Sequence, residues 1–390
     1  MTPALGAADA PDTSKNLVTL DSVVRSCATR LAELGTNLFE AAEVERLSPL
    51  LYDSFHRHGW PETVSEAERR NFRKAYYVIA GHNVELLNAL SEVALALRER
   101  AIRCVVFKGA DLIQRIYPNV ALRPMGDVDI YVPPDCAETA ESVLSTLGYR
   151  PFCPDMTKGL SQRVRHARLY VGGPNDATSI DLHWSLVGHG DDARAPDLNW
   201  VRANVLSQEG EPWMRLSETA HLLYLAAHMK LQHYDEEIPL LWLVDFHLLA
   251  TGGAIDWDQL WLDARRLGWS EAVSAVAFDV RERLGVALPE PLERIAKTPK
   301  SRLHRRGSRN EPERVLNELR ALDGWGRLAL LRAYVLPSPA YIRFRYPTLS
   351  CPLGYAKRWS TILAKTGAVV GRALRRQSEP RPLLGSRETC

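Results

Sequence analysis

Two aspartates separated by one residue are the part of this sequence that points most directly to chemistry. Asp127 and Asp129 lie in GDVDIYV, whose valine, isoleucine and tyrosine are typical of a β-strand. Residues i and i+2 of a strand face the same side, so the two carboxylates would lie side by side while Val128 and Ile130 face the core. Adjacent negative charges repel unless a cation lies between them, and Mg²⁺ or Mn²⁺ prefers carboxylate oxygens. The pattern therefore predicts a divalent-metal site, or else a strand with one solvated face.

A strand-to-helix turn upstream favours the metal interpretation. Residues 102–107 predict a strand that ends at Lys108 and Gly109, and a helix is expected over residues 111–117. Glycine at such a turn lets backbone amides approach a phosphate closely, and the N-terminus of the following helix attracts anions. Lys108 would add a phosphate contact, whereas the structural alternative is a lysine that merely ends a strand.

A third carboxylate can join the first two from a later strand. The segment SIDLHWSL alternates, so that Asp181 and His183 share one face and Leu182 faces the other way. Before the aspartate pair, Arg123 offers a planar donor fork that could steady a phosphate. Three acids and two cations are therefore expected around one site.

Composition divides the chain into helical and strand-rich blocks. Apolar residues recur at helical spacing before about residue 100 and again after about residue 218, and short apolar runs with turn residues between them fill much of the intervening segment. We predict a disordered N-terminus at 1–15, a helical lobe at 16–100, an α/β core at 101–190, a second helical lobe at 191–290 and an Arg-rich helical region at 291–390. Within the last region, helices are expected at about 311–334 and 355–375.

Bulk composition is that of an ordinary globular protein. The 390 residues are 46% apolar and 25% charged, and the formal net charge of +2 does not by itself indicate a nucleic-acid binder. The six cysteines include no C-x-x-C pair, which favours a reduced, cytoplasmic setting. The N-terminus lacks the pattern of a signal peptide and no apolar run approaches the length of a membrane span, so we expect a soluble protein.

An ordered set of motifs resembles a known family. FKGADL, RPMGDVDIYV and IDLHW, followed more loosely by LAAHMKLQHY and LLWLVDF, are similar to the DNA polymerase beta-like nucleotidyltransferase superfamily and, within it, to the uncharacterised nucleotidyltransferases. The resemblance covers roughly residues 80–250. It implies an α+β fold in which helical lobes on the N-terminal and C-terminal sides flank a small mixed-sheet nucleotidyltransferase core.

The resemblance also assigns roles by position. Gly109 matches the turn glycine near the triphosphate, Asp127 and Asp129 match the metal-binding pair, and Asp181 matches the third acid. The serine expected after the glycine is replaced by Ala110, so Lys108 becomes a candidate to contact phosphate in its place.

Three histidines and one aspartate are candidates for other roles. His183, His228 and Asp245 match the looser motifs and are expected to line an acceptor pocket. His221 and His228 are seven residues apart on an expected helix, which would also suit a metal site. The H-E-x-x-H spacing of a zinc site is missing, however, so packed or surface histidines are the preferred alternative.

Together these features predict metal-dependent transfer of a nucleotidyl group. The donor would be a nucleoside triphosphate such as ATP, the ion Mg²⁺ or Mn²⁺, and the acceptor a hydroxyl of a small molecule, peptide or protein. Phosphoryl transfer at the same site and a catalytically silent scaffold or binding module are the alternatives. Nucleic acid as a substrate is disfavoured because no broad basic and aromatic pattern accompanies the motifs, although transfer onto an RNA end stays open.

The C-terminal segment YAKRWSTILAKTGAVVGRALRRQ predicts a basic amphipathic helix. Such a helix could contact an anionic membrane surface or a nucleic-acid backbone. The preferred interpretation is the plainer one, a helix that is solvated outside and packed inside.

Overall fold

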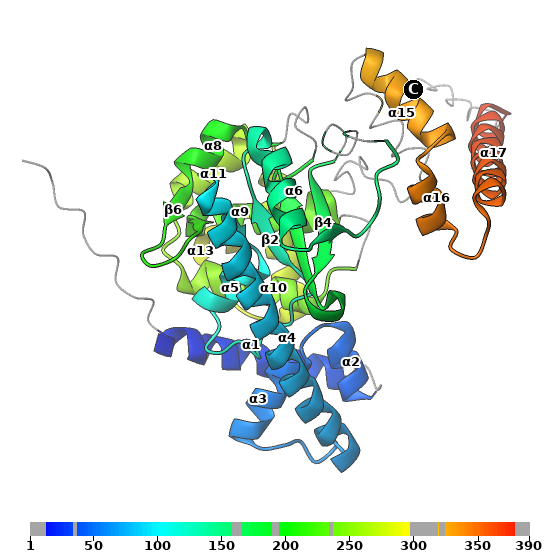
Figure 1. Cartoon of the computed structure of the whole chain (residues 1–390). Helices are drawn as coiled ribbons and strands as arrows, with labels where there is room; N and C mark the ends of the chain where they lie inside the picture. Colours follow the sequence, from blue (N-terminus) through cyan, green and yellow to red (C-terminus); the bar gives the residue numbers. More distant parts are fainter. Residues whose placement is uncertain are drawn as a thin grey trace, which may run out of the picture. The chain divides into compact units, whose positions relative to one another are not determined.

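The computed structural model describes residues 13–33, 37–157, 159, 162, 165–188, 195–233, 237–296, 319 and 324–378 (Figure 1). The chain divides into two compact units, and each is described by itself. The first contains Met1–Phe152 and Arg165–Gly307, and the second contains Cys153–Val164 and Ser308–Cys390.

A seven-stranded mixed sheet forms the centre of the first unit. Its strand order is β3-β4-β5-β2-β1-β7-β6, in which β2 runs parallel to β5 and antiparallel to β1. The α+β fold that the motifs implied, with a mixed sheet and helical flanks, is therefore confirmed. The strands are β1 (Val105–Phe107), β2 (Val128–Tyr131), β3 (Arg150–Pro151), β4 (Ala167–Gly172), β5 (Thr178–His183), β6 (Val205–Ser207) and β7 (Met214–Leu216).

The register of the central strands positions the acidic residues. Asp129 on β2 pairs with Asp181 on β5, and Phe107 on β1 is the partner of Asp129 on the other side. The residues between them alternate as expected, because Val128 and Ile130 are fully buried on the opposite face.

One face of the sheet packs against α4 (Glu66–Glu99) and α6 (Ala137–Thr146). Helix α4 begins with a capping box. The Glu68 backbone N–H donates to the Ser65 hydroxyl, and the Ser65 backbone N–H donates to the Glu68 carboxylate. Its buried leucines and valine recur at helical spacing and contact the sheet. They are Leu86, Leu90, Val93 and Leu97. Burial of each such side chain contributes about 2 kcal/mol, which is why this long helix fixes the sheet from one side.

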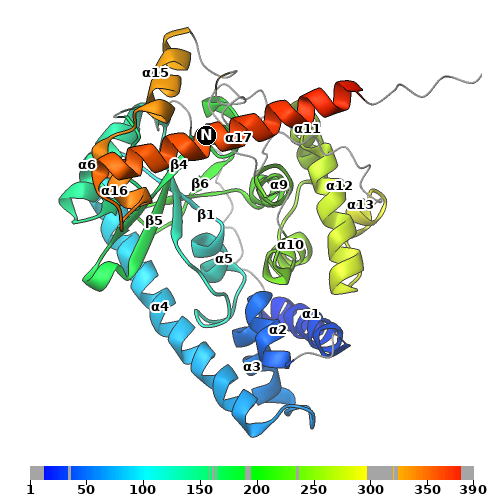
Figure 2. The ribbon, with the colours of Figure 1, turned by 90° about the vertical axis from the view of Figure 1, so that its right-hand side faces the viewer.

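Helices cover the other face, as Figure 2 shows with α9 and α10 across the sheet from α4 and α6. Helix α10 is apolar on nearly all sides and lies buried in the centre of this layer. Phe107 meets Tyr224 of α9 edge to face, with ring centroids 5.2 Å apart. The helices that share one hydrophobic cluster with α9 and α10 are α1 (Thr13–Glu33), α2 (Leu38–Val44), α3 (Ser48–His58), α11 (Trp257–Arg266) and α12 (Ser270–Asp279), with α9 at Glu218–Ala227 and α10 at Leu240–Gly252.

Short helices complete the first unit. Helix α5 lies between β1 and β2, and α8 lies before β6, while π-helical turns extend α9 and α12. Their bounds are α5 (Gly109–Arg115), α8 (Leu198–Ala203), α13 (Glu290–Glu293) and the π-helical turns His228–Gln232 and Val280–Leu284. Single 3-10 turns occupy Pro134–Cys136 and Pro174–Asp176.

A buried arginine connects the three helices described in the second unit. These helices are α15 (Gly324–Val335), α16 (Pro339–Arg345) and α17 (Cys351–Ser378). The guanidinium of Arg358 on α17 lies 5.6 Å from the ring centre of Tyr334 and 5.3 Å from that of Tyr341, and its Nε donates to the Tyr334 carbonyl at 2.8 Å. Among the described residues no helix is both long and apolar enough to cross a bilayer.

The observed elements differ from the expected blocks in three places. The sheet continues beyond residue 190 through β6 and β7, whose three residues each are too few to show a clear alternation. Helix α1 begins at Thr13, inside the segment expected to be disordered, and residues 1–12 lie outside the described part. The helix expected from residue 311 is described only at 319 and from Gly324 onward.

A buried histidine in α10 makes the stability of the first unit sensitive to acid. His247 is 3% exposed, its Nδ1 has no hydrogen-bond partner among the described residues, and burial lowers the pKa of His247 to about 4. The unfolded chain takes up this proton below about pH 6.5, so the contribution of neutral His247 is present above that pH and is lost as the pH falls toward about 4.

We therefore expect His247→Leu to flatten the acid side of the stability profile. About 1.5 pH units below the usual histidine pKa, the wild type should lose about 2 kcal/mol that the variant keeps. Urea melts of both proteins across this range measure the difference. Equal slopes of stability against pH in the wild type and the variant would contradict the lowered pKa of His247. Burial also lowers the pKa values of His221 and His228, so some slope should remain in both proteins.

Candidate active site

A cleft of about 320 Å³ gathers most of the residues that the sequence singled out. Eight of the nine predicted site residues line it; they are Lys108, Gly109, Arg123, Asp127, Asp129, Asp181, His228 and Asp245. The ninth, His183, is 1% exposed and lies behind the carboxylates. The cleft lies where β1 and β2 meet the α9 and α10 layer, and the roles of these residues stay predictions.

The carboxylates differ in their access to the cleft. Asp129 is in the middle of β2, with a side chain 7% exposed, and Asp181 on the neighbouring β5 is 22% exposed. Asp127 lies directly before β2 and lines the same cleft. Of the two carboxylates that are paired across β2 and β5, Asp181 is therefore the more accessible.

His183 connects the paired carboxylates. Its Nε2 lies 3.1 Å from Asp129 Oδ1 and 2.9 Å from Asp181 Oδ2, so the proton on Nε2 serves both. Burial alone would lower the pKa of His183, but Asp181 and Asp129 outweigh it and raise that pKa. In place of the acceptor-pocket wall expected for His183, the structure has a side chain that bridges the two acids.

Lys108 supplies the second positive charge. Its Nζ lies 2.7 Å from Asp129 Oδ1, and the attraction of Asp129 raises the pKa of Lys108 although burial opposes it. The same contacts hold the pKa of Asp129 far below its usual range. Lys108 is also the N-cap of α5, with φ +52° and ψ −132°, a conformation that residues other than glycine rarely adopt. Lys108 therefore combines a strained backbone with a positive charge that Asp129 balances.

A histidine from α9 holds the strained turn. The Lys108 backbone N–H donates to His221 Nε2 at 3.0 Å, so Nε2 must be unprotonated and the proton must lie on Nδ1. Nδ1 lies 2.9 Å from Asp111 Oδ2, to which it donates. Arg115 pairs with the same carboxylate, which explains its approach to Nδ1 without a hydrogen bond to it. Burial lowers the pKa of His221, which keeps the ring neutral as this tautomer requires.

A second ion pair fixes the other wall of the turn. Arg123 donates from Nε to Asp245 Oδ1 at 3.0 Å and from Nη2 to Asp245 Oδ2 at 2.7 Å, and Tyr117 donates to the same carboxylate at 2.7 Å. A Cβ placed on Gly109 would lie 2.3 Å from Arg123 Nη1. Glycine is thus required at 109 because the fixed guanidinium lies against the turn.

An aromatic wall closes the cleft on the side of α10. His228 stacks on Tyr224, with ring centroids 5.9 Å apart, and lies 4.6 Å from His233 and 5.1 Å from Trp242. Burial first, and Lys108 second, lower the pKa of His228 well below its usual value. His228 is therefore a neutral imidazole on an aromatic surface.

The roles of several residues of the site were not predicted from the sequence, in which His221 was considered only as a metal ligand or a packed histidine. Arg46, His233 and Trp242 line the cleft, and His221 supports it from behind. The only local signal was the i, i+4 pair of Asp111 and Arg115 on α5. No spacing in the sequence links that pair to His221, which is 106 positions beyond Arg115.

The donor set fits a hard divalent cation. In the described part of the chain, Asp129, Asp181 and His183 form the group with metal-ligand spacing, and their ligand atoms lie within 4.8 Å of one another. Burial and the charges of Asp129 and Asp181 raise the pKa of Asp127 to about 7, so the nearby Lys108 and His183 do not fully offset the negative charge. A cluster of carboxylates that still repel one another suits Mg²⁺ or Mn²⁺.

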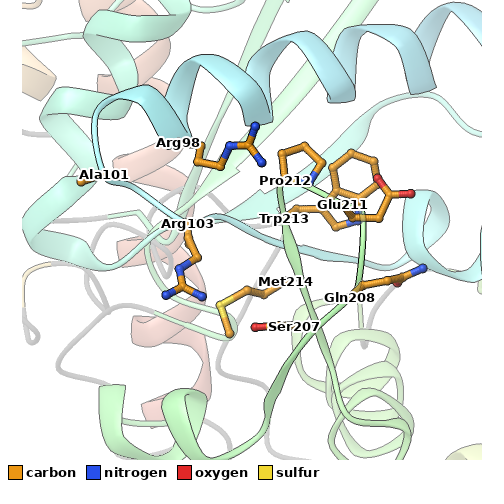
Figure 3. Close-up of a pocket in the computed structure, with 9 residues that line it drawn as sticks. All are labelled: Arg98, Ala101, Arg103, Ser207, Gln208, Glu211, Pro212, Trp213 and Met214. Carbon is orange, nitrogen blue, oxygen red and sulfur yellow. The ribbon is translucent and has the colours of Figure 1, made fainter. Parts of the chain in front are cut away.

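A second cavity of about 450 Å³ lies at the opposite end of β1 (Figure 3). Arg103, which precedes β1, and Arg98 from the end of α4 line it together with Trp213 and Glu211 of the β6 and β7 segment. It contains one carboxylate and no Lys-Gly turn, so the acidic chemistry belongs to the smaller cleft.

Comparison with known proteins agrees with this geometry. A search among curated proteins finds no match to the chain. The model of one protein family, described as uncharacterised nucleotidyltransferase, matches residues 36–285, which include every strand, the turn at Lys108 and all the carboxylates of the cleft. The chain belongs to this family of uncharacterised nucleotidyltransferases.

Proposed function

We propose that the protein transfers a nucleotidyl group from a nucleoside triphosphate to a hydroxyl of a small molecule, peptide or protein. The observation that carries this proposal is the register pairing of Asp129 with Asp181 beside the Lys108 turn, in one cleft of a chain that belongs to a nucleotidyltransferase family. The reaction forms a bond between the acceptor oxygen and the α-phosphorus and breaks the bond to the leaving pyrophosphate.

Asp127, Asp129 and Asp181 would hold Mg²⁺ or Mn²⁺, in keeping with their charge and shared cleft. A bound ion would lower the pKa of the acceptor hydroxyl and offset charge on the pyrophosphate. His183 orients Asp129 and Asp181 through its shared Nε2 proton. Loss of that proton would free Nε2 as a further ligand.

The basic side chains around the cleft would bind the triphosphate. Lys108 lines the cleft, and the missing side chain of Gly109 leaves room for the Arg123 guanidinium beside the turn, where both could contact a phosphate. Arg46 adds a cation from the turn after α2. Nε and Nη2 of Arg123 make three hydrogen bonds to Asp245. In contrast, Nη1, which has one long bond of 3.5 Å to the Pro124 carbonyl, faces Gly109 and could contact a phosphate.

The acceptor would approach from the side of Asp181 and the aromatic wall. Asp181 is the more exposed of the register pair, so it can orient the acceptor hydroxyl and take its proton. His228 and Trp242 provide a flat, mainly apolar surface for the acceptor. Incubation with each labelled triphosphate, Mg²⁺ and fractionated lysate tests the proposal, since release of pyrophosphate supports attack at the α-phosphorus and transfer of the γ-phosphate supports phosphoryl transfer.

We expect Asp127→Asn, Asp129→Asn and Asp181→Asn each to lower the transfer rate by at least about 100-fold. Each change removes a charged ligand and keeps the shape of the side chain, and even changes beyond the ligands often cost 10–100-fold. Without metal, Asp127→Asn should raise the melting temperature because it relieves repulsion at a carboxyl whose pKa is raised to about 7.

Asp263→Asn is the matched control for these variants. Asp263 is 4% exposed and accepts a hydrogen bond from Gln259 within α11, outside the cleft. Pyrophosphate release, a metal titration and a thermal melt should be compared in all four variants. Wild-type rates in Asp127→Asn or Asp129→Asn would reject the metal-dependent mechanism.

A methyl group at residue 109 is expected to weaken triphosphate binding at least tenfold. In Gly109→Ala the new Cβ would collide with Arg123 Nη1, which Asp245 holds in place, so either the turn or the guanidinium would have to move away from its position beside the phosphate. Calorimetric titration with a nonhydrolysable triphosphate measures the affinity. Gly81→Ala on α4, whose Cβ would meet nothing, controls for the substitution itself and should keep the wild-type affinity. Unchanged affinity in folded Gly109→Ala would remove the turn from the binding site.

His221 should act as a positioning residue for the phosphate-binding turn. His221→Leu removes the acceptor of the Lys108 N–H, an unmade buried bond that costs about 1–3 kcal/mol, and should weaken triphosphate binding. His221→Gln can still accept this bond and should restore part of the affinity.

The pH dependence of binding separates this role from simple packing. Because the pKa of His221 is lowered, the Lys108 bond is complete above about pH 6.5 and is lost as the pH falls and Nε2 gains a proton. Wild-type affinity should fall in acid more steeply than that of His221→Gln. Parallel pH profiles for the two proteins would show that His221 only fills space.

A further inference from the structure

The second unit exposes a large share of the protein's apolar side chains. Nine of the seventeen large apolar residues that are exposed in the described part of the chain come from residues 324–363. They are Trp325, Leu328, Leu331, Val335, Leu336, Phe344, Leu353, Trp359 and Leu363. The buried apolar cluster of this unit, in contrast, has only Leu330, Ala333 and Tyr334 at its centre. Among its described residues, the unit thus exposes more large apolar side chains than it buries.

These residues form an ordered surface on α15. Trp325, Leu328, Leu331 and Val335 recur at intervals of three and four residues, which places them along one side of the helix. They are between 47% and 80% exposed. The opposite side of α15 carries Leu330, Ala333 and Tyr334, which pack inside the unit. The exposed stripe is therefore the outer face of a helix whose inner face is already used.

The helical part of this unit is strongly basic. Residues 324–378 contain ten lysines and arginines and no aspartate or glutamate. The whole chain has a net charge of only +2, so the rest of the chain carries a net charge of −8. Arg327 and Arg332 lie on α15 itself, and Arg343 and Arg345 end α16.

We propose that this unit binds the surface of an anionic lipid bilayer through the α15 stripe and the surrounding basic residues. Tryptophan and leucine side chains enter the boundary between headgroups and acyl chains, and arginines bind the phosphate groups above them. Helices α15, α16 and α17 lie outside residues 36–285, which match the nucleotidyltransferase family, so this binding is separate from the transfer reaction.

The combination of exposed tryptophan with basic charge favours a lipid surface over a second copy of the chain or a nucleic acid as the binding partner. A second copy would bring ten more basic charges against the first, and no acidic residue between 324 and 378 would offset them. A nucleic acid would satisfy the arginines through its phosphates, but it would leave a stripe of leucine and valine without a partner. A bilayer with anionic headgroups accommodates both components.

Flotation of the full-length protein with lipid vesicles tests the proposal. Vesicles of phosphatidylcholine alone are compared with vesicles of phosphatidylcholine and phosphatidylglycerol. The wild type should float with the anionic vesicles and stay at the bottom with the neutral ones. Trp325→Ser with Leu328→Ser should reduce the bound fraction at least tenfold, and Arg343→Gln with Arg345→Gln should reduce the preference for anionic lipid.

The matched control removes apolar surface elsewhere. Val44 and Leu262 are 77% and 54% exposed in the first unit, so Val44→Ser with Leu262→Ser should float like the wild type. Circular dichroism checks that each variant is folded. The proposal would be overturned if the wild type did not float, or if flotation survived Trp325→Ser with Leu328→Ser. It would also be overturned if single-stranded RNA removed the wild type from the vesicles and this competition were unaffected by the change at Trp325.

Discussion

The architecture of the site depends on two carboxylates paired across adjacent parallel strands. Asp129 and Asp181 occupy the same register position of β2 and β5, so the sheet forces their charges together in a largely buried place. Burial and like charge both favour protonation, and only nearby cations can keep the pair ionised. Lys108 and His183 supply this charge, and both contact the same oxygen of Asp129. The contacts around the cleft can be understood as the means of holding these two cations in place.

Support for the cleft comes from ion pairs that are themselves buried. Arg123 is 7% exposed and Asp245 is 1% exposed, and removing one partner of such a pair typically costs about 3–5 kcal/mol because the other charge is left without compensation. Asn83 on α4 donates to the Arg123 carbonyl at 2.9 Å, which ties this wall to the far side of the sheet. Phosphate binding by Arg123 would therefore use a group whose position is fixed before a ligand arrives, which reduces the entropy lost on binding.

Local patterns in the sequence were enough to find the acids, but not the contacts that hold them. Asp129 and Asp181 could be recognised because alternation within a strand determines which face a residue occupies. The partners of the turn could not, because Arg123 and Asp245 are 122 residues apart and Lys108 and His221 are 113 apart. The strands β6 and β7 were missed for a related reason, since β7 owes its place to parallel pairing with β1 rather than to a pattern of its own.

The strained conformation of Lys108 follows from the relative size of two costs. Glycine would adopt φ +52° freely, whereas lysine in such a region costs about 1–3 kcal/mol. Glycine, however, would leave Asp129 with the His183 proton alone, and an inadequately compensated buried carboxylate costs several kcal/mol. The second cost is the larger, so lysine is the better residue at this position even though its backbone is strained. The bond from the Lys108 amide to His221 fixes that backbone, which means that a histidine remote from the carboxylates helps to keep them ionised.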